Sequence, residues 1–283
     1  MKIIRSAAEM TAFSKSAQRA GKSVGFVPTM GALHEGHLSL VRAARAQSDV
    51  VVVSIFVNPT QFGPNEDFAK YPRSFEQDRA MLEAENADCI FSPSVEEMYP
   101  PGGATWVTVE GLSDKLDGRS RPGHFRGVTT VVSKLFNIVE PQLAFFGQKD
   151  AAQVAIIRKM VHDLNFDVKI VVCPIVRESD GLAMSSRNAY LNQEQRRQAT
   201  ALSRSLQRVK TLIQQGETKA ETLIAAGKQV MTEEPEARLD YFEIVHPDTL
   251  DAVKDLSNGA LVAVAAYIGT TRLIDNLLVP AAH

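Results

Sequence analysis

The chain has 283 residues, of which 45% are hydrophobic and 23% charged. These values are typical of a folded protein with one large or two moderate domains, and they argue against disorder, a collagen-like repeat or a disulfide scaffold. Lys and Arg total 31 against 33 Asp and Glu. Because no basic excess is available to neutralise a run of phosphates, we expect no nucleic-acid partner, although a phosphorylated small molecule needs only a few donors.

The cysteines and the apolar stretches indicate the cellular setting. Cys89 and Cys173 each stand beside apolar residues, which is typical of buried, reduced thiols in a cytosolic protein rather than of a disulfide or metal site. The N-terminus shows no apolar segment of signal-peptide length. The longest apolar stretches, 50–57 and 261–268, are too short to cross a bilayer. We therefore expect a soluble, cytoplasmic protein with no membrane partner.

The first two thirds of the chain alternate short β-branched runs with longer amphipathic stretches. In chain order, this pattern predicts strands at 24–27, 50–57, 89–91, 143–146 and 168–172, and helices at 38–47, 74–85, 128–139 and 151–164. Ser74 is the expected N-cap of the 74–85 helix, with Gln77 in the capping-box position. Repeated β-α-β units imply right-handed crossovers, and the fold class expected is therefore α/β with a doubly wound parallel sheet.

The pattern changes after about residue 176. The last third of the chain predicts helices at 192–215 and 218–231, and strands at 241–245, 261–267 and 273–276. We therefore expect a larger domain over 1–176 and a smaller α+β domain over 177–283, with a hinge near 174–187.

The first segment that carries chemistry is Thr29-Met-Gly-Ala-Leu-His-Glu-Gly-His37, between the first strand of the alternation and its helix. Ligands of α/β sheets bind at this strand-to-helix edge, where a helix N-terminus offers N–H groups to a phosphate. His34 and His37 are three residues apart, so one helical turn can direct both imidazoles toward phosphate oxygens. An isolated pair of this spacing more often consists of a capping and a surface histidine, but the strand-to-helix context favours phosphate binding over that alternative and over zinc.

A second segment, Met184-Ser-Ser-Arg187, follows Asp180-Gly181. Two hydroxyls and a guanidinium in a glycine-bounded loop can hold a polyphosphate and stabilise its charge during reaction. Taken alone, such a loop is usually solvated, and its interest comes from occurring together with the histidine pair.

A third segment, Phe145-Phe-Gly-Gln-Lys-Asp150, lies between a predicted strand and a predicted helix. The helix dipole disfavours a lysine at a helix N-terminus. An anionic ligand near Lys149 would resolve that conflict, with Asp150 acting as a cap or acceptor. The alternative is a surface lysine beside a capping aspartate.

A fourth segment, Phe56-Val-Asn-Pro-Thr-Gln-Phe62, follows the second strand of the alternation. The amides of Asn58 and Gln61 suit recognition of hydroxyl and carboxylate groups without adding charge. By itself, Asn58-Pro59 indicates only a turn.

Together these segments resemble a known family. His34-Glu-Gly-His37 is similar to the His-x-Gly-His motif of the nucleotidyltransferase superfamily, and Met184–Arg187 resembles the shortened Lys-Met-Ser-Lys-Ser loop of that group. The phrases at 28–37, 54–62, 71–73, 121–128 and 146–150 together resemble the pantothenate synthetase (pantoate–β-alanine ligase) family over nearly the whole chain. The resemblance implies a Rossmann-like domain that binds ATP and pantoate, and a smaller lid domain. It also implies that (R)-pantoate and β-alanine are joined through pantoyl adenylate to give pantothenate, AMP and pyrophosphate.

The resemblance implies roles for single residues. The residues implied to bind ATP are Met30, Gly31, Ala32, Leu33, His34, Glu35, Gly36, His37, Gly147, Gln148, Lys149, Asp150, Val176, Met184, Ser185, Ser186 and Arg187. The catalytic residues among them are His37 as proton donor, His34, Lys149, Ser185, Ser186 and Arg187. Gln61 and Gln153 would bind pantoate, and Gln61 would also lie near β-alanine. Asp78 would help to hold Mg²⁺, and Arg121 and His124 would reach the phosphates or the closing loop. The family also implies a homodimer.

The sequence departs from the family pattern at two positions, and it leaves two other functions open. Gln148 stands where the family often has Glu, and Thr60 stands where Met is common. A related adenylyl- or cytidylyltransferase acting on a mononucleotide or phosphopantetheine would share the histidines and the Ser-Ser-Arg loop, but would not need Gln61 and Gln153. A catalytically silent nucleotide-binding module would not need His37 or Lys149. Pantoate-dependent exchange of pyrophosphate into ATP separates all three.

Overall fold

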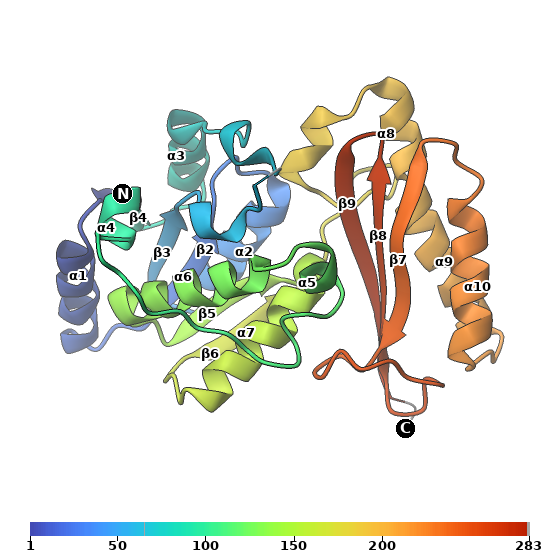
Figure 1. The fold of residues 1–283 in the computed structure, drawn as a ribbon. Coiled ribbons are helices and arrows are strands. Elements are labelled where there is room, and N and C mark those ends of the chain that lie inside the picture. Colours follow the sequence, from blue (N-terminus) through green and yellow to red (C-terminus); the bar gives the residue numbers. More distant parts are fainter. Residues whose placement is uncertain (65, 282–283) are drawn as a thin grey trace. The chain divides into compact units, whose positions relative to one another are not determined.

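A computed structural model describes residues 1–64 and 66–281. The chain forms two compact units (Figure 1). The N-terminal unit contains residues 1–114, 121–147 and 156–174, and the C-terminal unit contains 115–120, 148–155 and the chain from 175 onward. The functional division into 1–176 and 177–283 stays a prediction, and the structure adds that two short earlier segments group with the last third of the chain.

The N-terminal unit is built on a six-stranded parallel sheet flanked by helices, so the predicted α/β fold is confirmed. Its strands are β1 (Lys2–Ile4), β2 (Val24–Thr29), β3 (Val50–Ile55), β4 (Cys89–Phe91), β5 (Leu143–Gly147) and β6 (Lys169–Cys173). Their order in the sheet is β1-β4-β3-β2-β5-β6. The chain moves outward from β2 to β3 and β4, then returns to place β5 on the other side of β2. The strand order therefore reverses between β2 and β5, and such a switch point is where doubly wound sheets bind ligands.

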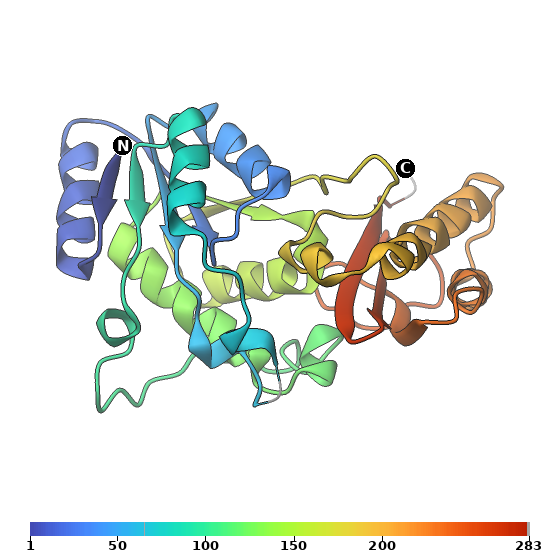
Figure 2. The same ribbon diagram turned by 90° about the horizontal axis from the view of Figure 1, so that it is seen from above.

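Helices cover this sheet, as Figures 1 and 2 show. They are α1 (Ala7–Arg19), α2 (Glu35–Arg45), α3 (Phe75–Ala84), α4 (Val95–Met98), α6 (His124–Val139) and α7 (Ala151–Asp163), whose first turn belongs to the C-terminal unit. Helix α2 packs on β2, β3 and β5, whereas α1 packs against α6. Every residue of β3 is buried, as expected of a parallel strand covered on both faces.

Two details differ from the sequence-based expectation. The strand β1 and the helix α1 were not predicted, because the strand has only three residues and little apolar periodicity marks the helix. Ser74 is the N-cap residue of α3, but its side chain makes no capping hydrogen bond, so the predicted capping box is wrong. Instead, its Oγ donates to Oδ1 of Asp78 over 3.3 Å.

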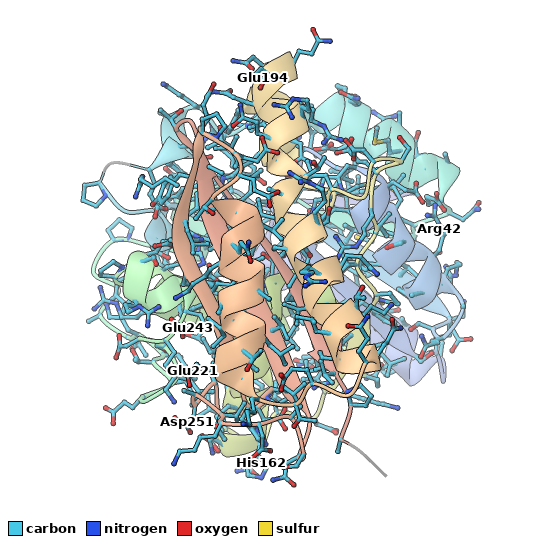
Figure 3. The ribbon with its side chains drawn as sticks, turned by 90° about the vertical axis from the view of Figure 1, so that its right-hand side faces the viewer. Arg42, His162, Glu194, Glu221, Glu243 and Asp251 are labelled. Atoms are coloured by element: carbon cyan, nitrogen blue, oxygen red, sulfur yellow. The ribbon has the colours of Figure 1, made fainter. Side chains whose placement is uncertain are left out.

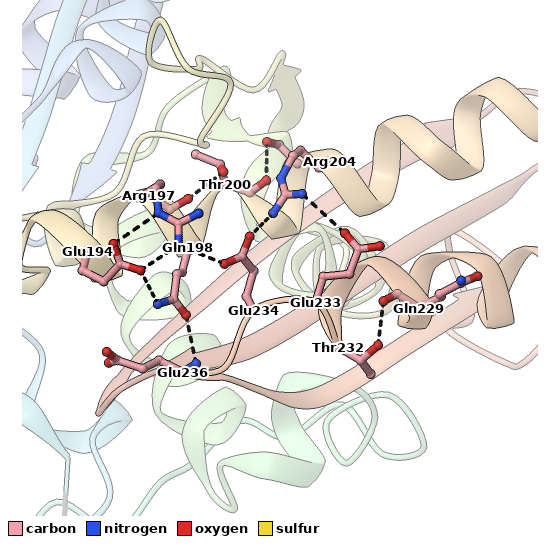
Figure 4. A network of polar contacts seen from close by, with 11 residues as sticks. Glu194, Arg197, Gln198, Thr200, Arg204, Gln229, Thr232, Glu233, Glu234 and Glu236 are labelled. Atoms are coloured by element: carbon pink, nitrogen blue, oxygen red, sulfur yellow. Dashed lines mark hydrogen bonds and ion pairs between the residues drawn. The ribbon is translucent and has the colours of Figure 1, made fainter.

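The C-terminal unit packs three helices and an antiparallel sheet of order β7-β8-β9 around one apolar core. The elements are α8 (Gln193–Ala199), α9 (Ala201–Gln214), α10 (Ala220–Met231), β7 (Ala237–Val245), β8 (Ala260–Ile268) and β9 (Thr271–Val279). The single helix predicted over 192–215 is wrong, because it is interrupted at Thr200. Before the interruption, the buried side chain of Gln198 donates to Glu194 over 2.8 Å and accepts from the backbone of Glu236 over 2.9 Å (Figure 4).

The short helix α5 (Asp117–Ser120) belongs to the C-terminal unit although it lies early in the chain. Ion pairs hold this segment there: Lys115 with Asp251 at 2.7 Å, Asp117 with Arg272 at 2.8 Å, and Arg119 with Glu243 at 2.5 Å. Asp251 and Glu243 are labelled in Figure 3. Within residues 1–64 and 66–281, no helix has the length and apolar character that a membrane crossing requires.

Candidate active site

A buried carboxylate stabilises the backbone conformation of the loop after β2. Gly31 and Ala32 both adopt positive φ, at 81° and 50°. Asp78, which is 1% exposed, accepts hydrogen bonds from the backbone N–H groups of Ala32 at 2.9 Å and Leu33 at 2.8 Å. Positive φ is uncommon for alanine, so these hydrogen bonds stabilise a backbone shape that the sequence would not adopt by itself. Asp78 therefore fixes the approach to α2.

The two histidines cap helix α2 from its first turn. His34 is the N-cap residue, and its Nδ1 accepts from the backbone N–H of Gly36 over 3.1 Å. The Nδ1 of His37 accepts from the backbone N–H of His34 over 3.4 Å, and the ring centroids are 4.2 Å apart. A neutral imidazole that accepts at Nδ1 carries its proton on Nε2. Both rings therefore present an Nε2–H donor from the N-terminus of a helix, which is the local chemistry of a phosphate site.

The side chain of Gln61 is oriented by Asn58. Asn58 is 1% exposed, and its Nδ2 donates to Oε1 of Gln61 over 3.0 Å and to the carbonyl of Gly127 over 3.1 Å. Its Oδ1 accepts from the hydroxyls of Thr60 and Tyr99, each over 2.9 Å. With its oxygen engaged, Gln61 directs Nε2 away from Asn58 and onto Sδ of Met30 at 3.1 Å. Because a thioether is a weak acceptor, this amide can exchange it for a ligand oxygen.

Thr60 is one of the departures from the family pattern, and its hydroxyl lies inside this network. It contacts Asn58 and also the hydroxyl of Tyr99 at 3.2 Å. The turn that carries it, η1 (Pro59–Gln61), packs directly on helix α6 at Gly127. A Cβ at Gly127 would come within 2.3 Å of the Thr60 carbonyl oxygen. Only glycine therefore permits the observed contact between α6 and this turn.

Arg121 and His124 hold the backbone of the same turn. His124 Nδ1 lies 2.8 Å from the carbonyl oxygen of Gln61, and Arg121 donates to that oxygen over 3.3 Å. Arg121 also pairs with Glu66 at 2.5 Å. Burial opposes the charge of Glu66, but the hydrogen bond and positive charge of Arg121 prevail and lower the pKa of this carboxyl. The structure thus uses both residues to position the Gln61 turn, and their predicted contact with phosphates stays a prediction.

In the C-terminal unit, Lys149 lies in the short turn η3 (Gln148–Asp150), immediately before α7. Its Nζ is 3.7 Å from Oδ1 of Asp150, and its side chain is 21% exposed. This places a partly desolvated ammonium at a helix start, as expected from the sequence. Gln153, the predicted pantoate-binding residue, is half-buried in the first turn of α7.

The predicted serine–arginine loop forms a second turn, η4 (Ser186–Tyr190). Ser185 caps it by accepting from the backbone N–H of Arg187 over 3.3 Å. The carbonyl of Val176 accepts from the backbone N–H of Met184 over 3.0 Å, so these two predicted nucleotide-binding positions are hydrogen-bonded neighbours. Strand β9 contacts both η3 and η4.

The predicted site residues thus fall into two clusters. The N-terminal unit brings together the loop 30–37, Gln61 and Asp78, and it also contains Gly147 at the end of β5. The C-terminal unit brings 148–150 and 176–187 against β9. That both clusters serve one ATP molecule stays a prediction.

No metal centre is evident in the part of the chain that the structure describes, where no three His, Cys, Asp or Glu side chains gather as ligands. Asp78 accepts from two backbone amides, and this commits its carboxylate to the loop after β2. This geometry gives no support to direct coordination of Mg²⁺, and the predicted metal role of Asp78 stays a prediction.

Sequence reasoning missed residues of β9. Arg177 donates to both oxygens of Asp275 at 2.6 and 2.9 Å, and Asn276 bonds the turn at Gln148. Asp275 and Asn276 are both buried. The available signal was two successive polar residues inside the apolar run Leu273–Leu278, which breaks the alternation of an ordinary strand.

A Rossmann-like sheet with a histidine-capped helix at its switch point, joined to a smaller antiparallel unit, defines an α/β protein of the nucleotide-binding type. The family model for pantoate-beta-alanine ligase matches residues 2–278. The chain belongs to this family, and it is a ligase that forms pantothenate in an ATP-dependent reaction.

Individual relatives agree with this assignment. The chain is 65% identical to a pantothenate synthetase of Koribacter versatilis, over 100% of this chain and 97% of the relative. It is 58% identical to the one of Thermotoga petrophila, with 98% and 99% covered. The crystal structure of pantothenate synthetase from Thermus thermophilus matches with a TM-score of 0.94 at 48% identity, covering 99% and 100%. That of the Francisella tularensis ligase, solved in complex with beta-gamma ATP and β-alanine, matches with a TM-score of 0.79 at 36% identity, covering 98% and 97%.

Proposed function

We propose that this chain joins (R)-pantoate and β-alanine in two steps. In the first, the pantoate carboxylate attacks the α-phosphorus of ATP, and pyrophosphate leaves as the P–O bond to it breaks. In the second, the amine of β-alanine attacks the acyl carbon of pantoyl adenylate, the acyl–oxygen bond to AMP breaks, and the amine loses a proton as the amide forms. Because a carboxylate and an amine are the nucleophiles, the protein's tasks are positioning and charge stabilisation.

The capped N-terminus of α2 is the observation that carries this proposal. Both imidazoles accept backbone hydrogens at Nδ1, so Nε2 of His34 and His37 serve as proton-bearing donors toward ATP. His37 is the proton donor to the phosphate oxygens on which negative charge develops during the reaction. The loop 30–37 leads into this helix N-terminus at the sheet's switch point, where β2 and β5 lie side by side.

The C-terminal unit supplies two cationic side chains, those of Lys149 and Arg187. We propose that Lys149, Ser185, Ser186 and Arg187 hold the polyphosphate, with Gly147–Asp150, Val176 and Met184 lining the rest of the nucleotide. Support comes from the packing of η3 and η4 on one strand, which keeps these two segments in one unit. Mg²⁺ bound together with ATP would supply positive charge that offsets the charge of the phosphates.

Pantoate is assigned to Gln61 and Gln153. The fixed orientation of the Gln61 amide supports this assignment, because an N–H donor on a weak thioether acceptor is ready for a carboxylate or hydroxyl oxygen. Gln61 is also assigned to β-alanine.

We further propose a cytoplasmic homodimer in the pathway to coenzyme A. Both cysteines are free and buried, and burial raises the pKa of their thiols, which suits a reducing compartment. The dimer rests on the family alone.

Exchange of labelled pyrophosphate into ATP tests the reaction. We expect exchange that requires pantoate and does not require β-alanine. Exchange that ignores pantoate would identify a different transferase, and an absence of exchange in folded protein would leave only nucleotide binding. A mass spectrum of the quenched mixture should contain pantoyl adenylate before β-alanine is added.

A further inference from the structure

The buried amide of Asn276 is devoted to the turn that carries Lys149. Asn276 lies on β9 and is 4% exposed. Its Nδ2 donates to the carbonyl oxygens of Gln148 and Lys149, each over 2.9 Å. Its Oδ1 accepts from Nε2 of Gln148 over 3.1 Å. Both amide hydrogens and the amide oxygen are therefore used on two adjacent residues.

The chemistry of this contact specifies asparagine. Two backbone carbonyls require two donors, and a buried carbonyl left without one carries an unfavourable desolvation energy. Aspartate has the same shape but no donor when ionised, so it would set a carboxylate against two carbonyl oxygens. The Gln148 amide completes the arrangement, since it donates to Asn276 where a glutamate could not.

The same strand fixes the second nucleotide-binding segment. Asp275, beside Asn276, accepts a two-pronged hydrogen bond from Arg177 at 2.6 and 2.9 Å, and its side chain is 1% exposed. Arg177 follows Val176, whose carbonyl holds Met184. Two successive residues of β9 thus hold the Lys149 turn and the 176–184 segment. Bidentate pairs of this kind restrict geometry as well as contributing energy.

A lysine ammonium sits at the end of a flexible four-carbon stem, so the position of the Lys149 Cα sets the region that the ammonium can reach. Misplacement of a catalytic group by about 1 Å can lower a rate about a hundredfold. We propose that Asn276 is a positioning residue for Lys149: by clamping the carbonyls of the 148–149 turn, it sets where the Lys149 ammonium meets the phosphates. The inference rests on the proposed role of Lys149 in ATP binding.

A double-mutant cycle tests this inference by measuring pantoate-dependent pyrophosphate exchange. Asn276→Ala is expected to lower kcat/KM for ATP at least about tenfold, and Asn276→Asp further, because repulsion is added to the lost donors. Asn276→Ser keeps one donor, so its kcat/KM for ATP should fall between the values of the unchanged protein and Asn276→Ala. This milder variant serves as the test if Asn276→Ala folds poorly. In the Lys149→Ala background, Asn276→Ala should change kcat/KM by less than about twofold, since its effect acts through the absent ammonium.

Asp240→Asn is the matched control. Asp240 is a polar residue of the same unit that pairs with Arg272 at 2.8 Å. This variant should lower Tm without lowering kcat/KM for ATP. The positioning role would be overturned if Asn276→Ala lowered kcat/KM equally with and without Lys149. It would also be overturned if Asp240→Asn lowered kcat/KM as much as Asn276→Ala at a similar loss of Tm. Near-normal exchange in Lys149→Ala alone would instead overturn the assignment of Lys149, and this inference with it.

Discussion

Leu33 donates its backbone N–H to Oδ1 of Asp78 over 2.8 Å, and this hydrogen bond joins the loop after β2 to helix α3. Together with the bond from Ala32, it makes the entry to the histidine-capped helix depend on a carboxylate from a distant part of the chain. Because Asp78 is buried, its removal leaves two backbone N–H groups without their acceptor and away from bulk water.

We expect Asp78→Ala to lower the free energy of unfolding by about 2 kcal/mol or more, because two backbone amides lose their acceptor. Asp78→Asn should also destabilise the protein, since its amide can face one N–H with an oxygen but not both. Urea denaturation measures both effects. An Asp78→Asn variant with unchanged stability and a raised requirement for Mg²⁺ would support the metal role and contradict the loop-holding one.

The histidine pair and Lys149 should dominate adenylate formation. His37→Ala and Lys149→Ala are each expected to lower pyrophosphate exchange about a hundredfold or more, or about 2.7 kcal/mol, as for other lost charge-stabilising donors. His162→Ala is the control, because that ring has an 83% exposed side chain and pairs only locally with Asp163. Pyrophosphate exchange near that of the control in both variants would contradict the roles assigned to His37 and Lys149.

Gln61→Ala should affect one substrate more than the other. The amide held by Asn58 is proposed to meet pantoate, so KM for pantoate should rise more than KM for ATP. Initial rates measured while varying each substrate separately give both values. Equal increases would indicate that the turn had collapsed rather than that a pantoate contact had been lost.

Gly127→Ala tests the packing beneath Gln61. The added methyl would lie 2.3 Å from the Thr60 carbonyl oxygen, so the turn has to move, at a cost of about 1–3 kcal/mol. We expect a lower Tm together with a raised KM for pantoate. Ser133→Ala, on the same helix but facing Met160, should leave that KM unchanged. If Gly127→Ala also left it unchanged, the turn would not control pantoate binding.

The cysteines should be inert in the folded protein. Burial raises the pKa of the Cys89 thiol to about 12. At pH 8 only about one molecule in ten thousand then carries the reactive thiolate. Iodoacetamide should therefore leave Cys89 and Cys173 unlabelled in native protein at pH 8 and label both in urea, as mass spectrometry reports. Rapid labelling without denaturant would show that the thiols are accessible.

Patterns of hydrophobicity predicted most of the N-terminal fold. A six-residue strand such as Val50–Ile55, buried along its whole length, is recognisable because a parallel strand needs apolar residues on both faces. The helix break at Thr200 was not recognisable, because the surrounding residues favour a continuous helix. The tertiary contact beside the break joins Gln198 to the backbone of Glu236, 38 residues away.

The sequence alone determined the chemical groups: the histidines at helical spacing, the lysine before α7 and the Ser-Ser-Arg loop. These groups are encoded locally, since short spacings and turn residues place the histidines and the lysine after strand ends and the Ser-Ser-Arg segment in a turn. Only the tertiary structure decided what holds them, because Asp78 with Leu33, Asn58 with Gly127 and Asn276 with Gln148 are separated by 45, 69 and 128 residues. Side-chain hydrogen bonds over such separations leave no periodic pattern in a sequence and form only when the folded backbone brings donor and acceptor together.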